Sequence, residues 1–208
     1  MRLSVSILNS KDKINMIKTL NNTKISYIHI DVMDGLFVSQ KSLPSNEIIK
    51  ISLFSSKPLD IHLMVENPMY YIERIKELPN IDNITIHLEI NKDIKNILNK
   101  IKEYGFKRSL AIKPNTDINL LVPYLDIIDR ILIMTVEPGL GGQPFLENSP
   151  NRIKEIKKLI KDKNIELEVD GGINNETINK VKDADISVVG SYITTSDNPA
   201  QRINDLLV

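Results

Sequence analysis

A short apolar segment carries two polar side chains near its end: Tyr27-Ile28-His29-Ile30-Asp31-Val32-Met33-Asp34-Gly35. Its β-branched and aromatic residues are typical of a β-strand, and Asp34-Gly35 is typical of the turn that ends one. Because side chains alternate along a strand, His29 and Asp31 point to the same face. Burying an imidazole beside a carboxylate is costly unless both have partners, so this strand end predicts a functional site.

Two other segments end in the same way. One reads Asp60-Ile61-His62-Leu63-Met64, and the other reads Ile165-Glu166-Leu167-Glu168-Val169-Asp170-Gly171-Gly172. If the three strand ends converge, they bring together two histidines and two carboxylates, namely His29, Asp31, His62 and Asp170. Imidazole nitrogens and carboxylate oxygens in this combination suit one divalent transition metal ion.

Short apolar runs alternate with longer amphipathic ones along the whole chain. The runs predict eight strands, at residues 3–8, 27–32, 59–64, 83–88, 108–112, 130–134, 165–169 and 186–189. Helices are predicted between them, for example at residues 11–20, 68–77, 94–104, 150–161 and 176–182. Eight strands, each followed by a helix, predict a single α/β domain over residues 1–208, a (β/α)8 TIM barrel.

An open doubly wound sheet is the main alternative fold. If such a sheet bound a dinucleotide, it would carry a glycine-rich turn after its first strand, whereas Leu8-Asn9-Ser10-Lys11 contains no glycine. The polar residues also follow the barrel pattern, because they gather at the C-terminal ends of the strands. In a barrel these ends form one face, on which residues far apart in sequence meet.

Composition narrows the possible functions. The 27 basic residues balance the 27 acidic ones, so the sequence predicts no global attraction to nucleic acid or to an anionic membrane. The absence of cysteine excludes disulfides, thiolate ligands and a cysteine nucleophile. The first residues read as a strand rather than a signal peptide, and no apolar run is long enough to span a bilayer. We therefore expect a cytoplasmic protein.

Several strings of the sequence together resemble the ribulose-phosphate 3-epimerase family. They are His29-Ile30-Asp31-Val32-Met33-Asp34-Gly35, Asp60-Ile61-His62-Leu63-Met64-Val65, Ala111-Ile112-Lys113-Pro114, Met134-Thr135-Val136-Glu137-Pro138-Gly139-Leu140-Gly141-Gly142-Gln143 and Glu168-Val169-Asp170-Gly171-Gly172. The strings fall in the family's order and spread over nearly the whole chain. The resemblance implies a (β/α)8 barrel that acts on a sugar phosphate.

The resemblance also implies roles for individual residues. His29, Asp31, His62 and Asp170 would hold one divalent metal ion, of zinc, iron, manganese or cobalt, and Asp31 and Asp170 would also be the catalytic acid and base. Ser6, His62, Met33, Met64 and Met134 would contact the substrate around the reacting carbon. The phosphate group would be bound by Gly141, Gly142, Gly171, Gly172, Gly190 and Ser191. The family commonly forms homo-oligomers, so we expect this protein to form a homo-oligomer.

Some positions depart from the family pattern or fall outside the ligand set. His87 lies in a string that matches the family, but it does not match a metal ligand of the family. We therefore expect it to have a structural role or to contact the ligands without binding the metal. The family usually continues Asp-Gly-His-Phe-Val-Pro-Asn, where this chain has Asp34-Gly35-Leu36-Phe37-Val38-Ser39-Gln40. A change in the substrate contacts of this loop is therefore expected. Tyr192 replaces a small residue after Gly190-Ser191, which predicts an altered floor of the phosphate pocket.

The predicted activity is metal-dependent 3-epimerisation of D-ribulose 5-phosphate to D-xylulose 5-phosphate, in the non-oxidative pentose phosphate pathway. Proton transfer by two groups through a planar enediolate would invert the carbon. One alternative is 3-epimerisation of a ketohexose 6-phosphate, and another is a non-catalytic phosphate-binding barrel. Related barrel decarboxylases and aldol-type synthases carry Asp-x-Lys-x-x-Asp, whereas Asp31-Val32-Met33-Asp34 contains no lysine.

Overall fold

Eight parallel strands follow one another in sequence order around a closed barrel in the computed structural model, which describes residues 1–207. The barrel closes because β1 pairs with both β2 and β8. The strands are β1 (Arg2–Ser6), β2 (Tyr27–Met33), β3 (Leu59–Met64), β4 (Ile81–His87), β5 (Lys107–Ile112), β6 (Arg130–Met134), β7 (Glu166–Asp170) and β8 (Ile186–Val189). The predicted single (β/α)8 barrel is confirmed, and the strand ends differ from the predicted ones by at most two residues.

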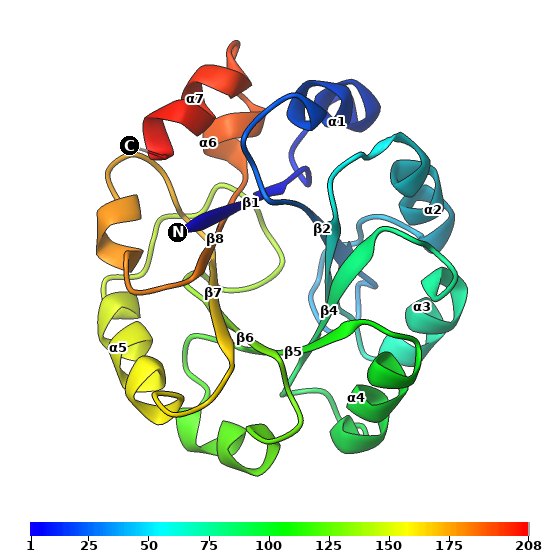
Figure 1. Ribbon diagram of the computed structural model, residues 1–208, viewed down its shortest axis with the longest axis vertical. Helices are drawn as coiled ribbons and strands as arrows, with labels where there is room; N and C mark the ends of the chain where they lie inside the picture. Colours follow the sequence, from blue (N-terminus) through cyan, green and yellow to red (C-terminus); the bar gives the residue numbers. More distant parts are fainter. Residues whose placement is uncertain (208) are drawn as a thin grey trace.

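Helices form an outer ring around the strands (Figure 1). They are α1 (Lys13–Asn21), α2 (Ser45–Phe54), α3 (Pro68–Ile75), α4 (Ile94–Glu103), α5 (Ser149–Leu159), α6 (Ser191–Thr194) and α7 (Pro199–Leu206). Their apolar faces pack on the barrel, as Ile97, Leu98 and Ile101 of α4 do. None of the helices within residues 1–207 is long and apolar enough to cross a membrane.

Two crossovers differ from the prediction of an α-helix after every strand. The connection after β5 forms a 3-10 helix at Ile118–Tyr124, which contains Pro123. Proline disfavours an α-helix because it lacks a backbone N–H and its ring clashes with the carbonyl group four residues earlier. The predicted helix at residues 176–182 is wrong in type, since only a 3-10 helix at Ile178–Val181 forms. There the Asn174 side chain accepts hydrogen bonds from the backbone N–H groups of Glu176 and Thr177, which holds a turn where the helix was expected to begin.

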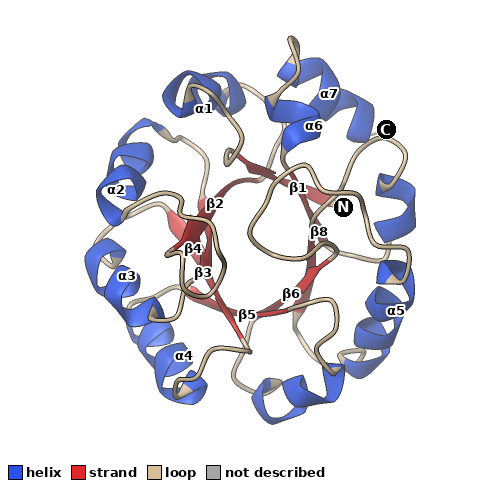
Figure 2. Cartoon of the chain, turned by 180° about the vertical axis from the view of Figure 1, so that it is seen from behind, coloured by secondary structure: helices blue, strands red, loops and turns tan. Residues whose placement is uncertain are grey.

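Long loops cover one end of the barrel. The yellow-green loop between β6 and α5 passes behind the ring of strands in Figure 1, and the opposite view brings it to the front (Figure 2). This loop starts after Met134, at the C-terminal end of β6. The C-terminal strand ends and the loops that follow them therefore surround the position where the sequence predicts a site.

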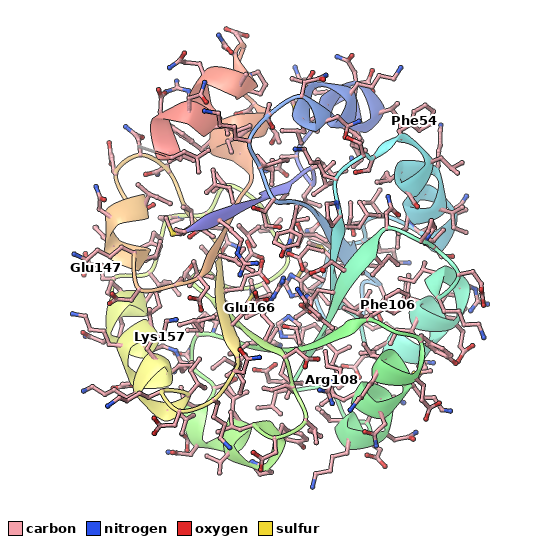
Figure 3. All side chains as sticks on the ribbon, in the orientation of Figure 1. Phe54, Phe106, Arg108, Glu147, Lys157 and Glu166 are labelled. Carbon is pink, nitrogen blue, oxygen red and sulfur yellow. The ribbon has the colours of Figure 1, made fainter. Side chains whose placement is uncertain are left out.

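Side chains fill the ring of strands, as Figure 3 shows around the labelled Glu166. A charged group lies at the centre: the Arg130 guanidinium is fully buried, and its Nη1 lies 3.1 Å from both Asp60 Oδ1 and Glu168 Oε2. Burial and the neighbouring Asp60 carboxylate raise the pKa of Glu168 to about 8. Against its own burial, Asp60 has a lowered pKa because His29 and Arg130 lie next to it, so Arg130 forms its buried charge pair with Asp60.

We expect Arg130→Met to lower the free energy of unfolding by about 3–5 kcal/mol. Methionine fills much of the same space, but it leaves the Asp60 carboxylate buried without its counter-charge. Urea denaturation of the wild-type and variant proteins measures the loss. Arg108→Met is a matched control, because Arg108 pairs with the partly exposed Asp129 and should cost about 1 kcal/mol or less. If the two variants lose the same free energy of unfolding, Arg130 is not the counter-charge that the buried Asp60 requires.

Candidate metal centre and active site

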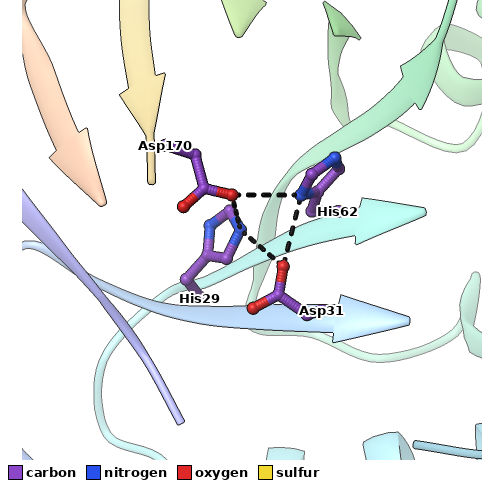
Figure 4. Close-up of side chains that lie close together, drawn as sticks. All are labelled: His29, Asp31, His62 and Asp170. Atoms are coloured by element: carbon purple, nitrogen blue, oxygen red, sulfur yellow. Dashed lines mark hydrogen bonds and ion pairs between the residues drawn. The ribbon is translucent and has the colours of Figure 1, made fainter. Parts of the chain in front are cut away.

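Three strand ends bring the four predicted ligands together. His29 and Asp31 come from β2, His62 from β3 and Asp170 from β7, and their side chains point toward one another (Figure 4). Asp31 Oδ1 lies 3.3 Å from His62 Nδ1 and 3.4 Å from His29 Nε2, and Asp170 Oδ2 lies 3.5 Å and 3.9 Å from the same two nitrogens. One ligand atom from each residue lies within 4.8 Å of all the others. The convergence predicted from the sequence is therefore present.

These donor atoms fit a single metal ion. Donors about 2.1 Å from one ion in a tetrahedral arrangement lie about 3.4 Å apart, close to the separations of this cluster. His29 Nε2 is buried and makes no hydrogen bond to any residue from 1 to 207, although it faces the two carboxylates. An unpaired buried nitrogen is costly, and a metal bond would satisfy it. The cluster could thus hold a divalent cation.

Electrostatics within the cluster favour a positive charge between the carboxylates. Burial opposes a charge on His29, but the Asp31 and Asp60 carboxylates outweigh it and raise the pKa of His29 well above its ordinary value. Burial likewise opposes the charge of Asp31, yet the adjacent His29 lowers its pKa. Against its own burial, His62 has a raised pKa because the Asp170 and Asp31 carboxylates lie next to its Nδ1. A bound cation would take over this role.

A cavity of about 360 Å³ opens above the cluster at the C-terminal end of the strands. Every predicted site residue except the two histidines lines it: Ser6, Asp31, Met33, Met64, Met134, Gly141, Gly142, Asp170, Gly171, Gly172, Gly190 and Ser191. His29 and His62 are completely buried beneath the cavity, where their nitrogens face the two aspartates. Such a volume is in the usual range for a small-molecule site.

The sequence and this site match one protein family. The model of the ribulose-phosphate 3-epimerase family matches residues 2–194. The chain belongs to this family. A ribulose-phosphate 3-epimerase of Helicobacter pylori strain J99 is 34% identical over 211 residues, covering 99% of this chain and 96% of the relative. The Bacillus subtilis strain 168 protein of the same name is 32% identical over 197 residues, covering 92% and 90%.

Solved structures of other enzymes share the fold. A mutant tryptophan synthase α-subunit from Pyrococcus furiosus superposes with a TM-score of 0.74 at 16% identity, covering 99% of this chain and 96% of that one. For 3-hexulose-6-phosphate synthase from Salmonella typhimurium the TM-score is 0.67 at 15% identity, with the same coverage. At these identities the likeness concerns the barrel and not the chemistry.

Two glycines after β7 are needed for the shape of the cavity. Gly171 and Gly172 have φ angles of 123° and 68°, which residues with a Cβ rarely adopt. A Cβ on Gly172 would lie 2.6 Å from the backbone nitrogen of Phe145, in the loop after β6. The pair therefore lets the two loops approach each other closely. This agrees with the family resemblance, but phosphate binding by these glycines stays a prediction.

The departures from the family pattern fall at different distances from the cavity. Leu36 is 77% exposed and is not among the lining residues, and its loop is held by Asp34, whose Oδ1 accepts hydrogen bonds from the N–H groups of Leu36 and Phe37. Tyr192 does line the cavity, and its hydroxyl accepts a hydrogen bond from Arg202. Any altered substrate contact is therefore expected at Tyr192 rather than at Leu36.

His87 contacts the cluster through His62, and a supporting role for it stays a prediction. Its Nε2 lies 2.9 Å from Nε2 of His62, and its Nδ1 lies 3.1 Å from Oε2 of Glu89. Burial and the nearby His62 lower the pKa of His87, to about 4, so the ring is neutral at neutral pH. The contact with His87 therefore uses Nε2 of His62. The other nitrogen, Nδ1, faces Asp31 and Asp170.

Two residues that were not predicted from the sequence contact the predicted site. Asp60 lies 2.8 Å from Nδ1 of His29, and Asn9 lines the cavity and donates a 2.8 Å hydrogen bond to Ser191 Oγ. The spacing of Asp60 and His62 is the signal that could have found the first, because it repeats the spacing of His29 and Asp31 on the preceding strand. No comparable pattern marks Asn9.

Proposed function

We propose that this chain interconverts D-ribulose 5-phosphate and D-xylulose 5-phosphate by metal-dependent 3-epimerisation. The observation that carries the proposal is the pair of carboxylates, Asp31 and Asp170, that meet beside two histidines at the base of one cavity. Family membership supports the same activity, since the relatives above are named for it. The reaction belongs to the non-oxidative pentose phosphate pathway.

Inversion at carbon 3 needs proton transfer on both faces of a planar intermediate. Asp31 comes from β2 and Asp170 from β7, which are not neighbours in the barrel, so the two carboxylates approach the cavity from different directions. One carboxylate removes the carbon-3 proton, and the other returns a proton to the opposite face. Which one acts as the base depends on the direction of the reaction. General acid–base groups of this kind contribute about 10²- to 10⁴-fold each.

Ser6 and the methionines complete the surroundings of the reacting carbon in this proposal. Ser6 Oγ donates a 2.6 Å hydrogen bond to Asp31 Oδ2, which fixes the carboxylate and leaves Oδ1 facing the histidines. Met33, Met64 and Met134 are almost completely buried and present apolar thioethers to the cavity. Their packing excludes water from the planar intermediate and so protects it from side reactions.

His29, Asp31, His62 and Asp170 would hold the divalent cation. When bound, zinc, iron, manganese or cobalt acts as a Lewis acid toward the oxygens of the substrate and stabilises the negative charge that develops on them. Two nitrogen and two oxygen donors accept all four metals, so the donor set does not select one of them.

In this proposal the phosphate group binds against the loops after β6, β7 and β8. Gly141 and Gly142, Gly171 and Gly172, and Gly190 with Ser191 line the cavity there. Barrel enzymes often bind phosphate at the loops after the last strands, where backbone N–H groups reach the ligand. Oligomerisation and a cytoplasmic location stay predictions.

Proton exchange at carbon 3 tests the proposal. Purified protein, reloaded with each of the four metals, is incubated with D-ribulose 5-phosphate in deuterated water and followed by proton NMR. We expect loss of the carbon-3 proton signal together with formation of D-xylulose 5-phosphate. A ketohexose 6-phosphate assayed in parallel measures the preference for chain length. Absence of exchange with every metal would favour a non-catalytic phosphate-binding barrel instead.

A further inference from the structure

Asp60 contacts the metal centre from below without belonging to it. It lies on β3, two residues before His62, and its Oδ2 is 2.8 Å from Nδ1 of His29. Both side chains are completely buried. A carboxylate without a proton can only accept a hydrogen bond, so Nδ1 of His29 must carry the proton. In the neutral ring that binds a metal, the lone pair of His29 is then on Nε2, the nitrogen that faces Asp31 and Asp170.

Asp60 is itself held by three other side chains. Ser4 Oγ donates to Oδ2 at 2.9 Å, Asn83 Nδ2 donates to Oδ1 at 2.9 Å, and Arg130 Nη1 donates to Oδ1 at 3.1 Å. With His29 this makes four donors for a carboxylate that has about four lone-pair sites. The Asp60 side chain therefore has no free rotation left, and its negative charge is paired with Arg130.

This group is not a second metal centre. Ligand atoms of His29, Asp60 and Glu168 lie within 4.8 Å of one another. However, the Arg130 guanidinium already bridges Asp60 and Glu168, at 3.1 Å from each. The positively charged Arg130 guanidinium therefore fills the space between the two carboxyl groups. The Asp60 carboxylate contacts His29 on its other side.

The two histidines of the centre use opposite nitrogens, and a different partner selects each one. His29 gives Nδ1 to Asp60 and turns Nε2 to the centre, whereas His62 gives Nε2 to His87 and turns Nδ1 to the centre. A ring nitrogen that faces such a partner is unavailable to a metal. The partner therefore decides which nitrogen of each histidine can bind.

We propose that Asp60 is a positioning residue of the metal centre, which holds His29 in the tautomer and orientation that present Nε2 to the cation. This inference rests on the metal site of the proposed function and adds a residue to it. Partners of metal-binding histidines typically contribute 10- to 100-fold to metal affinity. We expect an effect of this size for Asp60.

Asp60→Asn tests the proposal with little change in volume. The amide NH2 group cannot face the donors Asn83 and Arg130, so the amide oxygen turns to them and the NH2 group turns to His29. Nδ1 of His29 must then accept, which places the proton on Nε2 and blocks the metal. We expect the dissociation constant for Co²⁺, measured by titration of metal-free protein, to rise about 10- to 100-fold. The visible absorption of bound Co²⁺ should change as well.

Asp82→Asn is the matched control. Asp82 also pairs with Arg130, at 3.5 Å, but it is not a hydrogen-bond partner of His29. We expect its Co²⁺ dissociation constant to stay close to the wild-type value. If the two variants lose affinity equally, or if Asp60→Asn binds Co²⁺ as the wild type does, the role of Asp60 is overturned. A wild-type protein that binds no Co²⁺ would instead overturn the metal site itself.

A second measurement on the wild-type protein applies even if Asp60→Asn does not fold. The chain has only three histidines, so a ¹⁵N-histidine NMR spectrum of the Zn²⁺-bound protein can be assigned completely. We expect His29 to carry its proton on Nδ1 and to bind Zn²⁺ through Nε2, and His62 to show the reverse. Zn²⁺ bound to Nδ1 of His29 would overturn the proposal.

Discussion

Asp170→Asn is expected to lower kcat by about 10²- to 10⁴-fold while the barrel stays folded. The amide cannot take or return a proton at carbon 3, although it keeps nearly the shape of the carboxylate. Only 16% of the Asp170 side chain is exposed, and it belongs to the cluster of possible metal ligands, so the substitution acts on proton transfer and on the charge around the cation. Steady-state kinetics with D-ribulose 5-phosphate measure the loss, and thermal unfolding checks the fold.

Exchange experiments separate this role from a general loss of function. In deuterated water, Asp170→Asn should exchange the carbon-3 proton of only one epimer, the one whose proton faces Asp31. Asp31→Asn should show the complementary preference. Glu176→Gln is the control for loss of a carboxylate, because Glu176 follows the same strand but is exposed. Activity near the wild-type level in Asp170→Asn would remove this residue from the acid–base pair.

Removal of the metal is expected to lower turnover at least about a hundredfold, since the stabilisation that a Lewis acid gives to the developing charge amounts to several kcal/mol. Protein treated with a chelator and dialysed should recover activity when one of the four candidate metals is added back. Elemental analysis of untreated protein, purified without added metal, identifies the ion that binds during expression. Reactivation and elemental analysis together identify the metal, which the donor residues alone do not determine.

His62→Ala provides the control for metal removal. This variant lacks one nitrogen of the centre, so added metal should not restore its activity to the wild-type level. Its affinity for Co²⁺ should fall as well, which distinguishes loss of the site from loss of a substrate contact. Chelated wild-type protein that holds no metal and still turns over at the untreated rate would contradict the proposed chemistry.

The likeness to 3-hexulose-6-phosphate synthase concerns the fold and not the site. Both chains form similar barrels at 15% identity. In this chain Met33 lies two residues after Asp31, and its apolar thioether lines the cavity. Similar barrels can therefore carry different chemistry, which depends on the side chains that line the cavity.

From the sequence alone, the barrel and the four residues of the candidate metal cluster could be predicted. The alternation of apolar runs is a local property, and the spacing of His29 from Asp31 places both on one face of a strand whatever the rest of the chain does. Turn residues such as Gly171 and Gly172 mark the strand ends in the same local way. Residues at the C-terminal ends of barrel strands must then share one face.

Only the folded barrel shows which side chains contact these four residues. The neighbours of a buried side chain depend on the register between strands: His29 and Asp60 are paired across β2 and β3 although 31 positions separate them in sequence. Arg130 likewise reaches Asp60 from β6, across the interior. No periodicity encodes such contacts, because they arise from the closure of the barrel. The nitrogen that each histidine offers is therefore a property of tertiary structure.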